Sequence, residues 1–235
     1  MASGPSAALQ AFRKALERVL QLLRLERQYR EPVVAAKLPL VEGLRSGAIV
    51  LMIAAFEAFL REVFEERVDQ LARPPRPIRF ASLPDRMKTR SVYGLLEASM
   101  KGKPGHSSKT RINRLPEIQA AAKHVVDQDI VGSAFAMTGG NATSETVKTL
   151  FKQVDRPDLF NSIKSRFERH WSQPVASQFL QAKLDWIVEA RHEVAHGASL
   201  PSWSRDDLSE AVRFIRVLAR VLDDDLRIHL NSVGR

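Results

Sequence analysis

The stretch Ala48-Ile-Val-Leu-Met-Ile-Ala-Ala-Phe56 is the longest apolar run in the chain, and it lies in the middle of a helix predicted from about Leu40 to Leu71. Apolar residues surround the middle of this helix on nearly all sides, which is typical of a helix at the centre of a bundle. A membrane-spanning helix needs about 20 apolar residues, whereas Arg45 and Glu57 bound this run well short of that length. The run therefore predicts a central bundle helix and no membrane partner.

Further helices are predicted on both sides of this central helix, from apolar residues that recur at three- and four-residue steps. Their ranges are 6–29, 85–100, 116–127, 143–154, 157–170, 174–190 with its continuation toward 197, and a last helix that begins after the capping residue Ser204. No convincing strand and no internal repeat is present in the sequence. We therefore predict an all-α helical bundle that forms one domain over residues 1–235.

A basic segment lies between Arg73 and Arg114, inside a looser region, 73–140, that we predict to be an insertion within the domain. Eleven basic residues and two acidic ones fall between its ends, so this segment carries the whole net charge of +9. Such a block is typical of a surface that binds a polyanion, with RNA or DNA as the first candidate, although it is also typical of a solvated loop. The residues that we assign to RNA binding are Arg86, Lys88, Arg90, Lys101, Lys103, Lys109, Arg111 and Arg114.

The cellular compartment is indicated by what the composition lacks. The chain has no cysteine, which excludes disulfides and thiolate metal sites and fits a reducing compartment. No basic and apolar leader is visible at the start of the sequence. We therefore expect a cytoplasmic protein.

The candidate site is the stretch Arg191-His-Glu-Val-Ala-His-Gly197, which follows the apolar helix 174–190. Gly197 is the residue type that most readily adopts the left-handed conformation that ends a helix. Cationic side chains are favourable at a helix C-terminus, so one interpretation is that these residues only complement the helix dipole.

A zinc site is a second interpretation, because the letters from His192 to His196 match the H-E-x-x-H pattern. Four helical steps of about 100° place the two histidines about 40° apart, so both could reach one metal ion, with Glu193 as the base. A third ligand is not evident. The metzincin pattern needs glycine and histidine where Ser199 and Ser202 stand, and the downstream acids Asp206, Asp207 and Glu210 follow no zinc motif.

A third interpretation is a ribonuclease motif, since Arg191-His-x-x-x-His196 fits the pattern R-polar-x-x-x-H and ends in Ala-His-Gly. Two further stretches, Phe56-Glu-Ala-Phe-Leu-Arg-Glu62 and Gly140-Asn-Ala-Thr-Ser-Glu-Thr146, occur before it in the expected order. Together they resemble the HEPN family over roughly residues 40–225, and in particular its stand-alone RiboL-PSP-HEPN-like branch from toxin–antitoxin and phage-defence loci. The sequence departs from that family at His192, where asparagine is most common.

The resemblance implies a metal-independent endoribonuclease without a cofactor, in which a 2′-hydroxyl attacks the adjacent phosphorus and leaves a 2′,3′-cyclic phosphate and a 5′-hydroxyl. Histidine titrates near neutral pH and arginine matches phosphate oxygens, so we assign proton transfer to His196, charge stabilisation to Arg191 and orientation to His192. Glu57 and Arg61 either support this site or, as we favour, form an ion pair at the edge of the core.

The implied partners are RNA, a second copy of the chain and an antitoxin or defence-system protein. Five helical steps of about 100° leave Arg191 and His196 about 140° apart, so a homodimer with a composite active site is attractive. The main alternative is a non-catalytic HEPN-type module that binds RNA or a protein; the zinc hydrolase ranks below it.

Overall fold

The computed structural model describes residues 4–73, 77–101, 112–136, 140–197 and 203–233. Within these ranges the chain forms α-helices joined by loops and short 3-10 turns, and no strand is present. The helices are α1 (Ala7–Glu26), α2 (Leu38–Asp69), α3 (Asp85–Lys101), α4 (Leu115–Val126), α5 (Ser144–Gln153), α6 (Leu159–Trp171), α7 (Phe179–His196) and α8 (Arg205–Leu230). The prediction of an all-α bundle is confirmed, and no helix in these ranges is long and apolar enough to cross a membrane.

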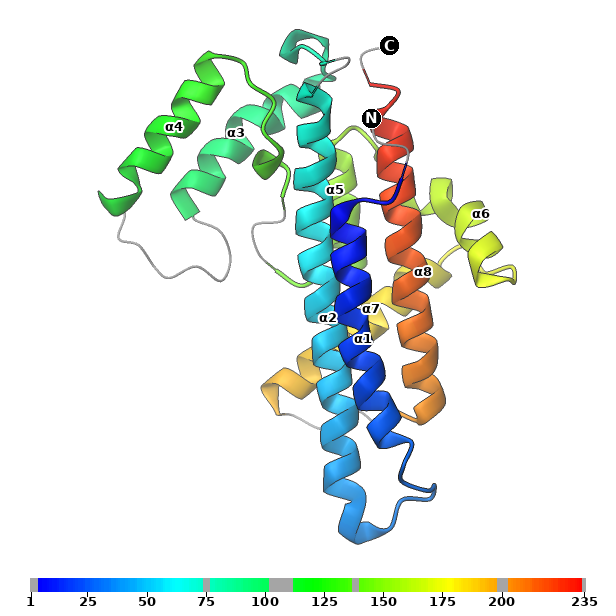
Figure 1. Cartoon of the computed structure of the whole chain (residues 1–235). Coiled ribbons are helices and arrows are strands. Elements are labelled where there is room, and N and C mark those ends of the chain that lie inside the picture. Colours follow the sequence, from blue (N-terminus) through cyan, green and yellow to red (C-terminus); the bar gives the residue numbers. More distant parts are fainter. Residues whose placement is uncertain (1–3, 74–76, 102–111, 137–139, 198–202, 234–235) are drawn as a thin grey trace.

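Helix α2 lies at the centre, with α1 and α8 running beside it along the length of the bundle (Figure 1). Its contacts are largely aromatic. The ring of Phe12 in α1 packs 5.4 Å from that of Phe59, and the ring of Phe64 packs edge-on at 5.0 Å against Phe151 of α5. Because α2 is apolar on opposite sides, it can bury Phe59 against α1 and Phe64 against α5 at the same time.

The region that was predicted to be an insertion forms the hairpin of α3 and α4, which packs on the 3-10 turn Gly132–Ala134. Its buried side chains, among them Met87 and Leu95, join the same hydrophobic core as the bundle helices. Glycine is required at 132, because a Cβ atom there would lie 2.1 Å from the carbonyl oxygen of Glu65. This turn therefore fixes the hairpin closely against α2.

Helix α7 begins five residues later than the predicted start at Pro174, and that prediction was wrong. The left-handed Ser172 ends α6, and the amide of Val175 donates a hydrogen bond to Glu168 of α6 instead of entering a new helix. Val175 still packs on the core, as its place in the apolar pattern indicates, but from the connecting loop. The predicted start of α8 is correct: Ser204 and Asp207 form a capping box.

Two buried charge clusters tie the ends of the long helices together. At one end Arg67 of α2 donates to Asp223 of α8 at 2.9 Å, and the amide of Ser6 donates to the other oxygen of the same carboxylate. At the other end Glu26 of α1 accepts hydrogen bonds from Arg45 of α2 and Arg205 of α8. Asp223 thus joins the N-cap of α1 to α2 and α8, and Glu26 joins α1 itself to the same two helices. These contacts fix the relative positions of the three helices.

The second cluster makes the stability depend on pH. Burial by itself raises the pKa of Glu26, but the hydrogen bonds from Arg205 and then Arg45 outweigh burial and hold the pKa below its ordinary value. A lowered carboxyl pKa stabilises the fold above the ordinary pKa, and this stabilisation is lost as the pH falls through the lowered value.

We therefore expect Glu26→Gln to lower the free energy of unfolding by about 2 kcal/mol at neutral pH, because two arginines lose a charged acceptor. The difference from wild type should shrink as the pH falls below the ordinary carboxyl range. Urea unfolding across a pH series measures both effects, with the exposed Glu17→Gln on the same helix as control. A difference that does not change with pH would contradict this account of Glu26.

Candidate functional site

The motif occupies the C-terminal end of α7, which projects beyond α2 in Figure 1. The helix ends where predicted, at Gly197, whose φ of 65° is left-handed. Ala190 is buried, whereas His192 and His196 are exposed and Arg191 is half-buried. The bundle therefore holds α7 by its preceding turns and leaves the last turn and a half accessible to a ligand.

Arg191 is held by Asn141, a residue that the sequence analysis did not assign to the site. The Nη1 atom of Arg191 donates to Oδ1 of Asn141 at 2.9 Å. Asn141 lies just before α5 in the stretch that resembled the middle of the HEPN pattern, and its own carbonyl accepts from the amide of Thr143. Asn141 thus fixes the direction of the guanidinium, although only the order of the three stretches in the sequence hinted at this.

Helix α5 is itself anchored to α7. Both the amide and the hydroxyl of Ser144 donate to the carboxylate of Asp185, at 2.7 and 2.6 Å. Asp185 therefore positions the first turn of α5 and, through it, Asn141.

The two histidines of the motif lie side by side. Their ring centroids are 4.2 Å apart, as the four-residue spacing predicts. Within the part of the chain that the structure describes, neither ring forms a hydrogen bond. Both imidazoles are therefore free to donate to, or accept from, a bound ligand.

Arg191 and His196 do not contact each other among the described residues. The guanidinium is bonded to Asn141 before α5, while His196 packs against His192 on the exposed end of the helix. This separation is what the angle of about 140° between positions five apart on a helix leads one to expect.

Among the described residues, His192 and His196 are the only two candidate metal ligands that come together at the motif. Within the described ranges, no group of three histidine or acidic side chains is placed to hold a metal ion. Of the downstream acids, Asp207 accepts from Ser204 in the capping box and Glu210 pairs with Lys183 at 3.0 Å. These two carboxylates are thus already engaged at the start of α8.

Glu57 lies in α2, and its Oε1 is buried without a hydrogen-bond partner among the described residues. No ion pair joins it to Arg61 there, so the preferred interpretation of these two residues was wrong. A shared helical face allowed the pair without requiring it.

The predicted RNA-binding residues differ in their availability. Arg86 is half-exposed and lies 3.6 Å from Asp155, and Lys88 pairs with Asp85. Arg90 is mostly buried and bonded to Glu97, and its side chain packs against Gly94. Arg114 points a guanidinium nitrogen toward the carbonyl of Met100. Lys103, Lys109 and Arg111, together with the side chain of Lys101, lie outside the described residues.

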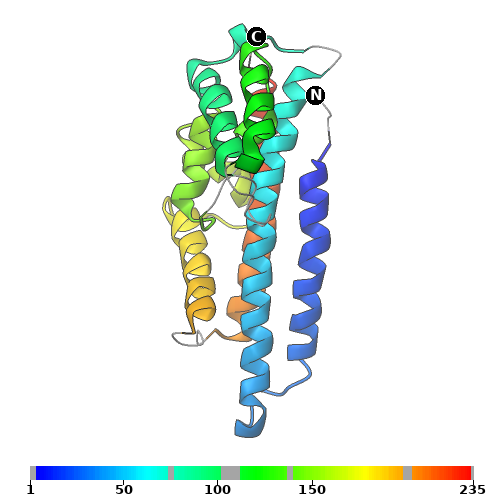
Figure 2. The same cartoon turned by 90° about the vertical axis from the view of Figure 1, so that its left-hand side faces the viewer.

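The hairpin of α3 and α4 and the motif end of α7 lie on the same side of α2 (Figures 1 and 2). Of the residues assigned to RNA binding whose side chains are described, Arg86 is the exposed one, and Lys88 is half-buried.

A family model described as RiboL-PSP-HEPN matches residues 14–227 of the chain. No curated protein and no solved structure gives a significant match. The matched range extends from α1 almost to the end of α8, so it includes the central helix, the stretch around Asn141 and the whole motif.

The anchoring of α5 gives a test that does not depend on any activity. We expect Asp185→Ala to lower the free energy of unfolding by about 1.5 kcal/mol, because the amide and hydroxyl of Ser144 lose their charged acceptor. Chemical denaturation measures the loss, with the exposed Glu189→Ala on the same helix as control. Equal effects of the two substitutions would show that Asp185 does not anchor α5.

Proposed function

Because the chain belongs to the RiboL-PSP-HEPN family, we propose that it is an endoribonuclease that cleaves RNA without a metal ion, with Arg191 and His196 as its catalytic residues. Ribonuclease activity or RNA binding is what a HEPN domain suggests. The observation that carries the proposal is the exposed end of α7, where two imidazoles without a hydrogen-bond partner among the described residues stand beside an arginine oriented by Asn141.

The chemistry follows from these groups. The 2′-hydroxyl of one ribose attacks the adjacent phosphorus, and the bond from that phosphorus to the 5′ oxygen of the next nucleotide breaks. His196 accepts the 2′ proton or returns a proton to the 5′ oxygen, since an imidazole titrates near neutral pH. Arg191 donates to the phosphoryl oxygens as negative charge develops. His192 orients the phosphate or His196, and the products are a 2′,3′-cyclic phosphate and a 5′-hydroxyl.

The active form in this proposal is a homodimer in which each site draws on both motifs. The separation of Arg191 and His196 within one chain supports this arrangement. So does the exposed surface on the N-terminal half of α2, where Leu40 and Leu51 are 48% and 43% exposed and Gly43 and Ala54 are also exposed. In Figure 2 α2 faces the viewer between α1 and α7. A second copy on this face would cover apolar surface and bring a second motif close.

The basic segment supplies the affinity for RNA in this proposal. We assign to the phosphates of the substrate Arg86, Lys88, Arg90 and Lys101 of α3, and Lys103, Lys109, Arg111 and Arg114 after it. In the cell such a nuclease acts as a toxin or defence effector, held in check by an antitoxin or another partner protein. The competing proposal is a non-catalytic module, which binds RNA without turnover.

We expect the purified protein to cleave labelled single-stranded RNA in excess EDTA and the His196→Ala variant to lose at least about a hundredfold in rate, because proton transfer is worth that much. Gel analysis of the end groups checks the products. Glu193→Gln is the matched control, since it removes the base of a zinc site and should retain most of the activity. Loss of cleavage in EDTA, restored by zinc, would contradict the proposal, and binding without cleavage would favour the module.

The dimer has its own test. We expect Leu51→Glu to give a monomer by light scattering and to abolish cleavage, because a charge on the exposed face of α2 opposes burial against a second copy. Ile228→Glu is the control, since Ile228 is 48% exposed on α8 toward the other end of the bundle.

Mixing the inactive Arg191→Ala and His196→Ala proteins should restore about a quarter of the wild-type rate, because half of the dimers then contain one intact site of two. A monomeric wild-type protein, or mixed variants that remain inactive, would rule out the composite site.

A further inference from the structure

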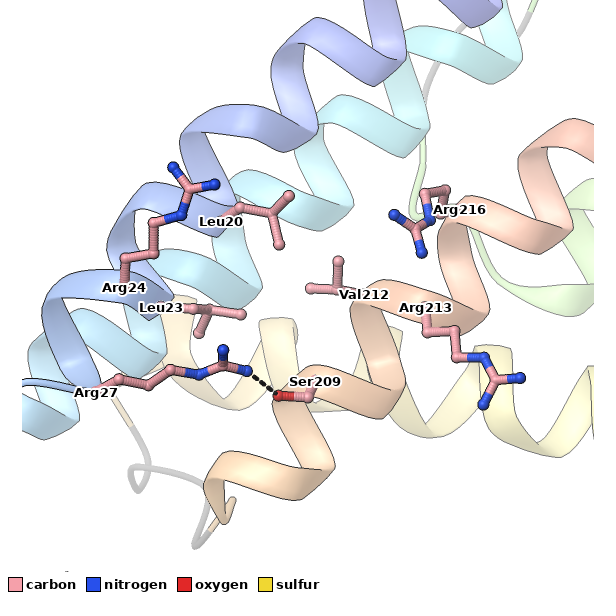
Figure 3. Close-up of a pocket in the computed structure, with 8 residues that line it drawn as sticks. All are labelled: Leu20, Leu23, Arg24, Arg27, Ser209, Val212, Arg213 and Arg216. Atoms are coloured by element: carbon pink, nitrogen blue, oxygen red, sulfur yellow. Dashed lines mark hydrogen bonds between the residues drawn. The ribbon is translucent and has the colours of Figure 1, made fainter. Parts of the chain in front are cut away.

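A groove lies between the C-terminal half of α1 and the N-terminal half of α8 (Figure 3), and none of the proposed catalytic residues lines it. Its volume is about 250 Å³, and its apolar lining comes from Leu20, Leu23 and Val212. The groove is smaller than the roughly 300–1,000 Å³ of pockets that enclose a drug-sized ligand. It therefore suits one small group of a larger molecule better than a complete organic ligand.

Arginines surround this apolar lining. Arg24 comes from α1, Arg27 follows its last residue, and Arg213 and Arg216 come from α8; no acid among the described residues lines the groove. Figure 3 shows Arg24 and Arg27 on one rim and Arg216 on the opposite rim, with Arg213 turned away. Residues far apart in the sequence thus converge on one strongly positive depression.

The four arginines are not equally free. Arg27 donates to the hydroxyl of Ser209 across the groove at 3.2 Å, and Arg213 donates to the carbonyl of Trp171 while its guanidinium lies 4.3 Å over that indole ring. Arg24 and Arg216 form no hydrogen bond and no ion pair within the described part of the chain. Two guanidinium groups on opposite rims therefore keep all their donors available for an anion.

Several buried or half-buried arginines elsewhere in the bundle are paired with carboxylates. Arg67 is bonded to Asp223, and Asp225 accepts from both Arg156 and Arg166. Like charges gathered without a counterion destabilise a compact fold. No acid among the described residues lines this groove, so an external anion would compensate the charge that its arginines concentrate there.

The positive surface continues along α8 toward α6. Burial lowers the pKa of His170 below its ordinary value, and the neighbouring Arg220 and Arg169 lower it further, while Asp224 acts in the opposite direction. Arg213 and Arg220 are seven residues apart, so they are separated by about 10 Å along the helix. A positive strip of this length is more than one phosphate needs and suits a chain of phosphates.

We propose that the groove between α1 and α8 is a binding site for the phosphate groups of single-stranded RNA, with Arg24 and Arg216 as the principal contacts and Arg27 in support. The choice of RNA as the polyanion rests on the proposed function. One nucleotide places its phosphate between the rims and its sugar or base on Leu20 and Val212, and the strand continues along α8 past Arg220. The site lies apart from the motif of α7 and outside the basic segment 73–114.

The test measures RNA binding in the His196→Ala background, so that cleavage does not interfere. Fluorescence anisotropy of a labelled single-stranded RNA is recorded over a range of salt concentrations. We expect Arg24→Gln with Arg216→Gln to weaken binding about tenfold and to reduce the slope of log K against log salt by about 1.4, because two phosphate contacts are lost. Ser209→Glu, which places a carboxylate beside Arg27, should weaken binding as well.

The matched control is Lys14→Gln with Arg18→Gln, which removes the same charge from exposed positions of α1 that do not line the groove. Equal weakening by the two double variants, or none by the groove variants, would overturn the proposal. So would a groove that binds inorganic phosphate but leaves RNA affinity unchanged on substitution, because its occupant would then be a free anion.

The two proposals can fail separately. A wild-type protein that binds RNA through the groove without cleaving it would overturn the nuclease and leave this inference standing. If the wild-type protein cleaves RNA and the groove variants bind RNA as tightly as it does, the nuclease proposal stands and this inference is overturned.

Discussion

The burial of α2 is the constraint on which the rest of the structure depends. A helix of 32 residues that is apolar on nearly every side is stable only where other helices cover it, and α1, α5, α7 and α8 do so. Apolar contacts alone allow these helices to slide along one another. The buried carboxylates Glu26 and Asp223 remove that freedom, because an unpaired buried charge is costly and each has its arginine partners at one position only.

The same constraint is only partly satisfied in a single chain. Leu51 of α2 remains 43% exposed, and α2 lies between α1 and α7 in Figure 2. Arg191 and His196, which we propose as the catalytic residues, also do not meet among the described residues of one chain. In the proposed dimer, a second copy would cover the apolar face of α2 and bring a second motif near the first. Dimerisation would then both bury this face and complete the active site.

Buried and exposed charges are arranged differently in the bundle, and the net charge alone does not reveal this difference. Inside, arginines are paired with acids and hold helices together. On the outside, the described residues include basic side chains on α3 and others along α1 and α8. A nuclease that held RNA on both would engage its substrate over a longer stretch than the motif alone, and its affinity would depend steeply on salt.

The sequence by itself determined the helices, the central place of α2, the end of α7 at Gly197 and the capping of α8, because these depend on residues within a few positions of one another. It also determined the family, through three stretches in order. Only the tertiary structure decided that Asn141 holds Arg191, that Glu57 and Arg61 do not pair, that α7 begins at Phe179, and that Arg24 and Arg216 share a groove. Helical periodicity specifies which side of a helix is buried but not which distant residue it meets, and that choice is made when the helices pack.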